Sequence, residues 1–268
     1  MCCATVLVCT VLITPSPAQT TDPNLPDSPS HVAQYGIDPN SPEARKVTWK
    51  GVPRDFLHDQ KMIWLFPGQL AKGRHWVPTA AIVGGTAGLI IADKHIMPYF
   101  RAHQKNLDDI NDTFDTMITT GEVVLIPAAL LVGGYARHDD YAVSTAILAG
   151  EAYADSAVVD LAIKAVSRRK RPVDVPPGQP FTDTFFDGGK SPFRGSAFPS
   201  GHAAGAFSVA TVMANRYRSH KWVPFVMYGF ATAVSCSRIT TLAHFPSDVF
   251  LGAALGYTIT KFDTLQPR

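Results

Sequence analysis

The chain has 268 residues, of which 46% are hydrophobic and 17% are charged, and its formal net charge is +2. This length allows one large domain or two small ones, and the apolar balance still permits a soluble helical protein. The near-neutral charge argues against a general nucleic-acid-binding protein, so each basic cluster has to be explained by its local setting.

Residues 1–18 have the pattern of an export signal. Cys2 to Ile13 form a short apolar core, and Ser16-Pro17-Ala18 offers small residues for cleavage. The segment has no Lys or Arg, so a short membrane anchor is the alternative, although the core is too short to span a bilayer comfortably. We therefore expect an exported protein, periplasmic or membrane-associated, with its functional site outside the cytoplasm.

Three of the four cysteines lie inside this signal, so the mature chain would keep only Cys236. A single cysteine excludes an intrachain disulfide. Cys236 stands in an apolar run beside Ser237 and Arg238, and we expect a small buried side chain there rather than a reactive thiol.

Residues 19–50 are rich in Pro, Asp, Ser and Thr, which predicts a flexible linker. Residues 51–268 are predicted to form one helical domain. Its first element would be a short amphipathic helix that ends near Pro67-Gly68. The apolar positions of this helix are Phe56, Leu57, Ile63, Trp64 and Leu65.

Apolar segments of helical length follow. They are Val77–Ala92, Val123–Ala136, Tyr141 to about Arg169, the run after Ser200, Trp222–Ser237 and Val249–Thr260. Without an alternating pattern that would demand a sheet, these segments predict an all-α fold, a helical bundle of about six main helices. No uncharged run reaches the 18 residues of a clear transmembrane helix, so the pattern leaves membrane insertion open.

The segment 173–197 is a long loop rich in Pro and Gly between two predicted helices. A loop of this length inside a compact domain is usually functional. It leads directly into Pro199-Ser200, and Lys190 and Arg194 within it are weaker candidates for substrate contact.

The stretch Pro199-Ser200-Gly201-His202 reads as the start of a helix, with Ser200 as its N-cap. A helix N-terminus presents unpaired N–H groups and a partial positive charge, which suits an anion. Gly201 lets a ligand approach the backbone closely, and His202 beside it can carry a proton near neutral pH.

Two charged clusters flank this stretch. Lys164 and Arg171 are seven residues apart, a spacing that returns to the same helical face, and Pro172 biases Arg171 toward an extended conformation. The alternatives are a solvated basic helix end, which would also include Arg168, Arg169 and Lys170, and an Asp160–Lys164 pair.

The other cluster combines Arg238, His244 and Asp248. Arg238 ends an apolar helix, His244 falls in a turn, and Asp248 falls in the first turn of the last helix. A carboxylate so placed can accept a hydrogen bond from one ring nitrogen of His244 and leave the other nitrogen free to attack. The alternative is an ordinary helix cap with a histidine nearby.

Together the three clusters supply three cations, an open helix N-terminus and two histidines, the groups that phosphoryl transfer needs. Their spacings, Lys164-(x6)-Arg171-Pro172, Pro199-Ser200-Gly201-His202 and Ser237-Arg238-(x5)-His244-(x3)-Asp248, resemble the tripartite signature of the type-2 phosphatidic acid phosphatase superfamily, which also includes vanadium-dependent haloperoxidases. The signature spans about a third of the chain, and every position of it is filled.

The resemblance implies a helical fold, a role for each motif residue and no metal or other cofactor. It implies that His244 is the nucleophile that forms a phosphohistidine, that Asp248 orients it and that His202 protonates the leaving oxygen. The phosphate-holding groups it implies are Lys164, Arg171, Ser200, Gly201 and Arg238.

This resemblance leads us to expect a metal-independent phosphatase of phosphate monoesters or diphosphates, with a phosphorylated lipid or a small phosphate ester as substrate and a membrane surface as partner. A vanadate-dependent haloperoxidase and a non-catalytic membrane or scaffold protein are the alternatives. Other polar residues are expected at helix ends without a metal, namely His75, Asp93, His95, His138, Asp139 and Asp140. Glu151 and Asp155 are assigned a structural role.

Overall fold

The computed structural model describes residues 47–107, 111, 121–188 and 196–266. All regular elements among these residues are helical, which confirms the predicted all-α class. The α-helices are α1 (Val52–Ala71), α2 (Trp76–Ala102), α4 (Ile126–Arg137), α5 (Asp140–Ser167), α6 (Gly201–Arg216), α7 (Trp222–Thr240) and α8 (Pro246–Ile259). Short turns of 3₁₀ helix at Gln104–Asn106 and Pro172–Asp174, and of π-helix at Gly121–Leu125 and Thr260–Thr264, complete the described elements.

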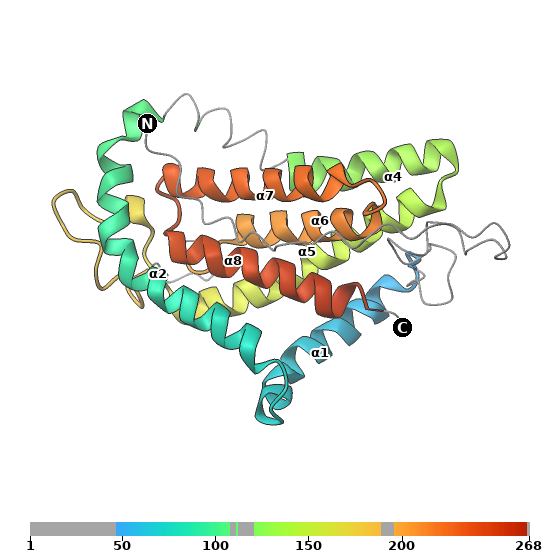
Figure 1. Ribbon diagram of the computed structural model, residues 1–268, viewed down its shortest axis with the longest axis horizontal. Helices are drawn as coiled ribbons and strands as arrows, with labels where there is room; N and C mark the ends of the chain where they lie inside the picture. The colour runs from blue at the N-terminus through green and yellow to red at the C-terminus, as the bar shows by residue number, and fades with distance from the viewer. Residues whose placement is uncertain (1–46, 108–110, 112–120, 189–195, 267–268) are drawn as a thin grey trace, which may run out of the picture.

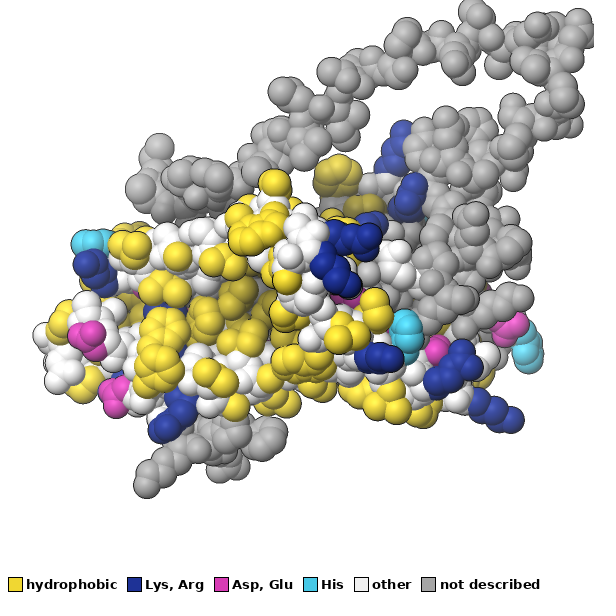
Figure 2. Space-filling model, turned by 90° about the horizontal axis from the view of Figure 1, so that it is seen from below, with side chains coloured by type: hydrophobic (Ala, Val, Ile, Leu, Met, Phe, Trp, Pro, Cys, Tyr) yellow, Lys and Arg dark blue, Asp and Glu magenta, His cyan; other side chains and the backbone are white. Residues whose placement is uncertain are grey.

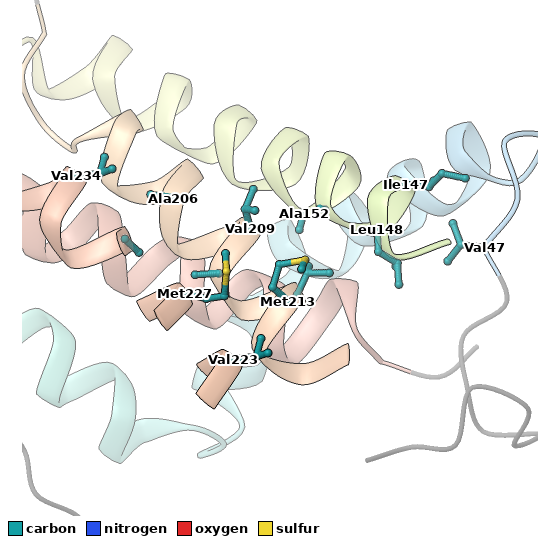
Figure 3. Close-up of a cluster of buried hydrophobic side chains, with 14 residues drawn as sticks. Val47, Ile147, Leu148, Ala152, Ala206, Val209, Met213, Val223, Met227 and Val234 are labelled. Atoms are coloured by element: carbon teal, nitrogen blue, oxygen red, sulfur yellow. The ribbon is translucent and has the colours of Figure 1, made fainter. Parts of the chain in front are cut away.

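The centre of the bundle is α6, which packs against α5, α7 and α8 (Figure 1). Its buried face contributes Ala206, Val209 and Met213 to a hydrophobic core that also contains Leu148 of α5 and Met227 of α7 (Figure 3). Around this core, α4 and α1 pack on α5, and α2 packs on α8. This packing brings the ends of α5 and α7 and the starts of α6 and α8 together in the bundle.

Two glycines bring α8 into direct contact with the backbone of α6. A Cβ atom on Gly252 would lie 2.3 Å from the carbonyl oxygen of Ser200, and one on Gly256 would lie 2.1 Å from that of Ala204. Both distances are far inside van der Waals contact, so only glycine fits at these two positions. The start of α6 is thus fixed on α8 by backbone-to-backbone packing.

The first helix differs from the expected one in its end and in its buried face. It continues through Pro67 to Ala71. Its buried residues are polar, because Gln60 donates through Nε2 to Oδ1 of Asp155 on α5 at 3.0 Å. The apolar side chains Leu57 and Trp64 are exposed instead.

The second helix also turns its polar residues inward. It buries Thr86, Asp93 and Met97, which form one stripe along the helix, while Val83 and Ile91 are exposed. It is long and apolar enough to cross a membrane, and only 11% of its most apolar 18-residue stretch is buried among the described residues.

Several predictions concern residues outside the described part of the chain. These are the signal at 1–18, the linker up to residue 46, and Lys190 and Arg194 of the long loop. The expectation that Cys236 is buried is wrong: Cys236 lies on an exposed face of α7, because the apolar run around it faces the surface as well as the core.

Candidate active site

The start of α6 has the predicted geometry. The helix begins at Gly201, and Ser200 is its N-cap, with an extended backbone and a side-chain oxygen that accepts a hydrogen bond from the N–H of Ala203 at 3.4 Å. The N–H of Ser200 donates to the carbonyl oxygen of Asp248 at 2.9 Å, which joins the start of α6 to the start of α8. The peptide bond between Phe198 and Pro199 is cis.

The last turn of α5 places Lys164 beside this helix start. A Cβ atom on Gly201 would lie 3.0 Å from Nζ of Lys164 and 3.0 Å from Oδ2 of Asp160, so the glycine leaves room for both side chains. Lys164 and Asp160 also form an ion pair of 2.7 Å, so the Asp160–Lys164 pair offered as an alternative is present, and Lys164 lies beside the helix start that we expect to hold an anion. Burial raises the pKa of Asp160, and the charges of Lys164 and His244 oppose this rise.

Arg171 approaches the same region from the segment that follows α5. Its backbone is extended, with φ −73° and ψ 151°, as predicted from the proline that follows it. The N–H of Val173 donates to the carbonyl oxygen of Leu242 at 3.0 Å, which ties this segment to the loop between α7 and α8. Nε of Arg171 is buried without a hydrogen-bond partner among the described residues, so it is a donor available to an oxyanion.

The loop that holds His244 is folded back onto the end of α7. The carbonyl oxygen of Arg238 accepts hydrogen bonds from the N–H groups of Ala243 and His244, each at 3.0 Å. The side chains of Arg238 and His244 are 5% and 3% exposed, respectively. This loop therefore fixes His244 next to the cation that ends α7.

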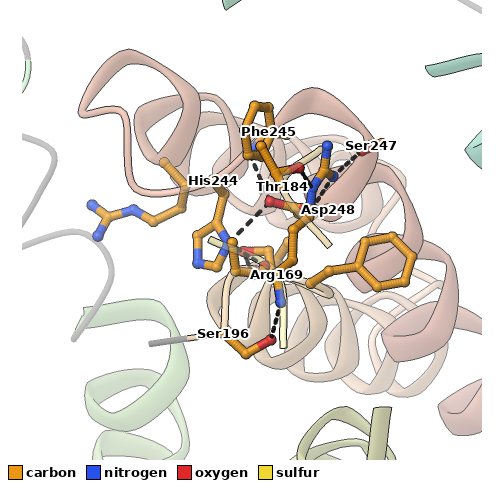
Figure 4. Close-up of polar contacts among 12 residues, drawn as sticks. Arg169, Thr184, Ser196, His244, Phe245, Ser247 and Asp248 are labelled. Carbon is orange, nitrogen blue, oxygen red and sulfur yellow. Dashed lines mark hydrogen bonds and ion pairs between the residues drawn. The ribbon is translucent and has the colours of Figure 1, made fainter. Parts of the chain in front are cut away.

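The His244 ring has a hydrogen-bond partner that the sequence pattern did not reveal. Its Nδ1 lies 2.7 Å from the carbonyl oxygen of Ala197, whereas Asp248 Oδ2 is 3.7 Å away (Figure 4). A carbonyl oxygen only accepts, so the contact with Ala197 places a proton on Nδ1 and leaves the lone pair on Nε2. Asp248 Oδ2 instead accepts from the N–H of Phe245 at 2.7 Å, and the carboxylate acts on the ring as a nearby charge.

The structure thus brings the three clusters to the same end of the bundle. His202 stands in the first turn of α6 with an exposed side chain. Arg171, Lys164 and Arg238 come from three different segments around the start of that helix. These cations and N–H groups offer the donors that an oxyanion needs.

Arg169 is a residue that the motif spacing does not single out. The sequence offers it only as part of the alternative, a solvated basic helix end, but Arg169 is 1% exposed, because Arg168 adopts a left-handed conformation (φ 42°) that ends α5 and turns the chain inward. Its guanidinium contacts Asp248 and Asp93. Asp93 was expected at a helix end, but α2 continues to Ala102 and Asp93 lies inside it.

Three other buried carboxylates lie away from these motifs. One side-chain oxygen from each of Asp59, Glu151 and Asp155 lies within 4.8 Å of the other two, between α1 and α5. Asp155 accepts hydrogen bonds from Gln60 and from Thr264, the latter at 3.1 Å. Glu151 and Asp155 therefore face the interior of the bundle rather than solvent.

Comparison with known proteins finds a family profile that matches the second half of this helical bundle. The profile described as the PAP2 superfamily matches residues 144–267, which are just under half of the chain and include all three clusters. A lipid A 1-phosphatase from Porphyromonas gingivalis is 38% identical over 65 residues, which are 24% of this chain and 15% of that protein. The match therefore covers a small part of that relative.

A solved structure was also found to be similar. It is a transmembrane PAP2-type phosphatidylglycerolphosphate phosphatase from Bacillus subtilis, 20% identical, with a TM-score of 0.41. The alignment covers 76% of this chain and 93% of the other.

Proposed function

We propose that this protein is a metal-independent phosphatase that hydrolyses phosphate monoesters or diphosphates of lipids through a phosphohistidine intermediate. The observation that carries the proposal is the 2.7 Å contact between Nδ1 of His244 and the Ala197 carbonyl oxygen, which calls for a proton on Nδ1 and so leaves Nε2 as a nucleophile beside cations and a helix N-terminus. The match of residues 144–267 to the PAP2 superfamily profile supports the same chemistry.

In the first step, the lone pair on Nε2 of His244 attacks phosphorus, and the bond between phosphorus and the ester oxygen breaks. His202 gives its proton to the departing oxygen, so the alcohol leaves neutral. Lys164, Arg171 and Arg238 hold the non-bridging oxygens together with the N–H groups at Ser200 and Gly201. Asp248 stabilises the positive charge that the His244 ring acquires.

In the second step, a water molecule attacks the phosphohistidine, and the phosphorus–nitrogen bond breaks. The neutral His202 takes a proton from this water, which restores both histidines and releases inorganic phosphate. The positive charge around the phosphoryl group comes from arginine and lysine, so the cycle balances without a metal ion.

The test is phosphate release in the presence of EDTA, together with an acid-quenched reaction on a ³²P-labelled substrate. We expect activity to persist in EDTA and labelled phosphate to stay on the wild-type protein but not on His244→Ala. Activity that EDTA abolishes and magnesium restores would contradict the proposal. Halide oxidation with vanadate and peroxide would instead identify a haloperoxidase. If the protein catalyses neither reaction, the remaining alternative is a non-catalytic scaffold protein.

We propose a phosphorylated lipid as the substrate class. The name of the Porphyromonas gingivalis relative points to a lipid phosphate, and the outward-facing apolar side chains of α1 and α2 suit a protein that meets its substrate in a membrane. A panel of phosphatidic acid, an isoprenyl diphosphate, lipid A and a soluble phosphate ester tests this. Faster hydrolysis of the soluble ester than of every lipid would exclude a lipid phosphatase.

We further propose that the protein is exported and works outside the cytoplasm. The apolar core at Cys2 to Ile13 and the small residues up to Ala18 support cleavage before Gln19. Mass spectrometry of the mature N-terminus tests this, and an intact Met1 on cytoplasmic material would contradict it.

A further inference from the structure

We propose that Arg169 and Asp93 are positioning residues for the reaction at His244. They would hold Asp248, and through it the imidazole, in the arrangement that attack on phosphorus requires. The chemistry of this inference rests on the proposed function, but neither Arg169 nor Asp93 is a residue to which the three motifs assign a role.

The guanidinium of Arg169 is held by both aromatic and polar contacts. Its Cζ lies 3.8 Å from the centre of the Phe245 ring and 4.5 Å from that of the Phe185 ring. Its Nε donates to Oγ1 of Thr184 at 3.1 Å. A side chain held by stacking and by hydrogen bonds in its plane has one orientation, which is what a positioning group needs.

This guanidinium joins two carboxylates from distant helices. Nη1 donates to Oδ1 of Asp248 at 2.5 Å, and Nη2 donates to Oδ2 of Asp93 at 2.8 Å. Ser247 completes the connection, because its hydroxyl accepts from Nη1 of Arg169 at 2.7 Å and donates to Oδ2 of Asp93 at 2.5 Å. The three charged residues are at most 1% exposed.

Both oxygens of Asp248 are therefore engaged. Oδ1 accepts from Arg169, and Oδ2 accepts from the N–H of Phe245 while facing Nδ1 of His244 at 3.7 Å. The carboxylate cannot rotate without losing one of these contacts. The position of the negative charge behind His244 is thus set by Arg169 (Figure 4).

The charge balance of the cluster also favours a role in the reaction. One guanidinium faces two carboxylates, so Asp93 offsets the positive charge of Arg169 and leaves Asp248 with net negative charge toward His244. The imidazole ring becomes positive as it attacks phosphorus. A fixed negative charge there stabilises the transition state more than the resting enzyme, which is the condition for catalysis.

A structural ion cluster would give a different result from a positioning cluster. Buried ion pairs are costly to form, and removing one partner destabilises the fold whatever its role. Five-coordinate vanadate resembles the phosphoryl transition state and needs a correctly placed nitrogen ligand, whereas inorganic phosphate needs only the anion-holding groups. Comparing the two anions therefore separates orientation of His244 from general integrity of the site.

The experiment uses the full chain with Asp93→Asn, which keeps the size of the side chain and one of its two hydrogen-bonding oxygens, and Arg169→Lys, which keeps the charge but loses the planar guanidinium. Binding of inorganic vanadate and inorganic phosphate is measured by calorimetry, and kcat and KM by phosphate release. We expect both variants to bind vanadate about tenfold more weakly with phosphate binding unchanged. We expect kcat to fall about ten- to hundredfold at constant KM.

The control is Asp187→Asn, which breaks the exposed pair of Asp187 with Lys170 on the same segment and should leave all four quantities unchanged. Equal weakening of vanadate and phosphate binding, or no change in either, would overturn the positioning role. If Arg169→Lys does not fold, Asp93→Asn decides the question. Wild-type protein that binds vanadate but hydrolyses no ester would contradict the proposed function, while the contrast between the anions would still decide the role of Asp93.

Discussion

At the scale of single residues, the two histidines of the site differ in their surroundings. His244 is buried, with its Nδ1 on the Ala197 carbonyl, whereas His202 is exposed in the first turn of α6. Burial suits a nucleophile with one fixed tautomer, and exposure suits a group that exchanges protons with the leaving oxygen and with water. The two residues should therefore respond differently to the leaving group.

Loss of His202 should depend on the substrate, and loss of His244 should not. An alkyl phosphate has a poor leaving group that needs a proton, so we expect His202→Ala to slow it far more than a nitrophenyl phosphate. His244→Ala should reduce hydrolysis of both substrates by several orders of magnitude, because it removes the nucleophile. Steady-state rates of the two variants on both substrates test this. Equal losses on both substrates in His202→Ala would exclude it as the general acid.

A second residue-scale effect concerns stability. Burial raises the pKa of Asp263 from 3.8 to about 6, and the charge of His75 opposes this rise. The folded chain thus holds this proton more tightly than the unfolded chain. The contribution of Asp263 to the free energy of unfolding is therefore fully present below about pH 4 and is lost as the pH rises through about 6. We expect Asp263→Asn, which is always neutral, to unfold at a higher temperature than the wild type near pH 7 and at nearly the same temperature near pH 4.

Thermal unfolding of the two proteins between pH 4 and pH 7 measures this difference. Asp183→Asn is the control, because Asp183 is exposed and its left-handed backbone (φ 53°) accepts asparagine. A gap between Asp263→Asn and wild type that stays constant across this range would contradict the assignment.

At the scale of elements, the contact between α6 and α8 determines where the site is built. Gly256→Ala would place a methyl group 2.1 Å from the carbonyl oxygen of Ala204, so the helices would have to separate. We expect the free energy of unfolding to fall by about 1–3 kcal/mol. We also expect kcat to fall in the fully folded variant, since the start of α6 would move relative to α8. Chemical denaturation and kcat measure the two effects.

The matched control for this substitution is Gly229→Ala on α7. No atom lies within 4 Å of a Cβ at that position, and the residue is exposed. Alanine should stabilise the helix there by about 0.5–1 kcal/mol. Equal effects of the two substitutions would show that the α6–α8 contact is looser than its geometry indicates.

The sequence predicts these elements well where the signal is local. Long apolar runs predict where the helices lie along the chain, and Ser200 before Gly201 predicts the start of α6. The contacts that lie far apart along the chain escape such an analysis. Arg169 looks like a solvated basic residue until its partner Asp93, 76 residues earlier, is brought beside it by the packing of α2 on α8. The contact between His244 and the Ala197 carbonyl oxygen cannot be predicted from the sequence either, since every residue has a backbone oxygen and the two residues are 47 positions apart.

At the scale of the whole molecule, α1 and α2 share an unusual orientation. Each buries polar side chains against the bundle and exposes apolar ones, as Gln60 and Leu57 of α1 and Asp93 and Ile91 of α2 illustrate. Figure 2 shows a face of the molecule where hydrophobic side chains gather over a broad area. A surface of this kind is stable in contact with lipid and a liability in water.

We therefore expect the protein to be recovered with membranes, to remain there in high salt and alkaline carbonate, and to be released by detergent. The formal net charge of +2 is too small for binding by electrostatic attraction alone, so salt should have little effect. Ile91→Lys, at a position of α2 that is 68% exposed, should sharply reduce the amount in the membrane, because a charged residue near the centre of a spanning helix costs about 3 kcal/mol to insert. Val173→Lys is the control, since Val173 is similarly exposed but lies in the turn after α5. Release of the wild type by carbonate, or equal membrane recovery of the two variants, would contradict a lipid-facing α2.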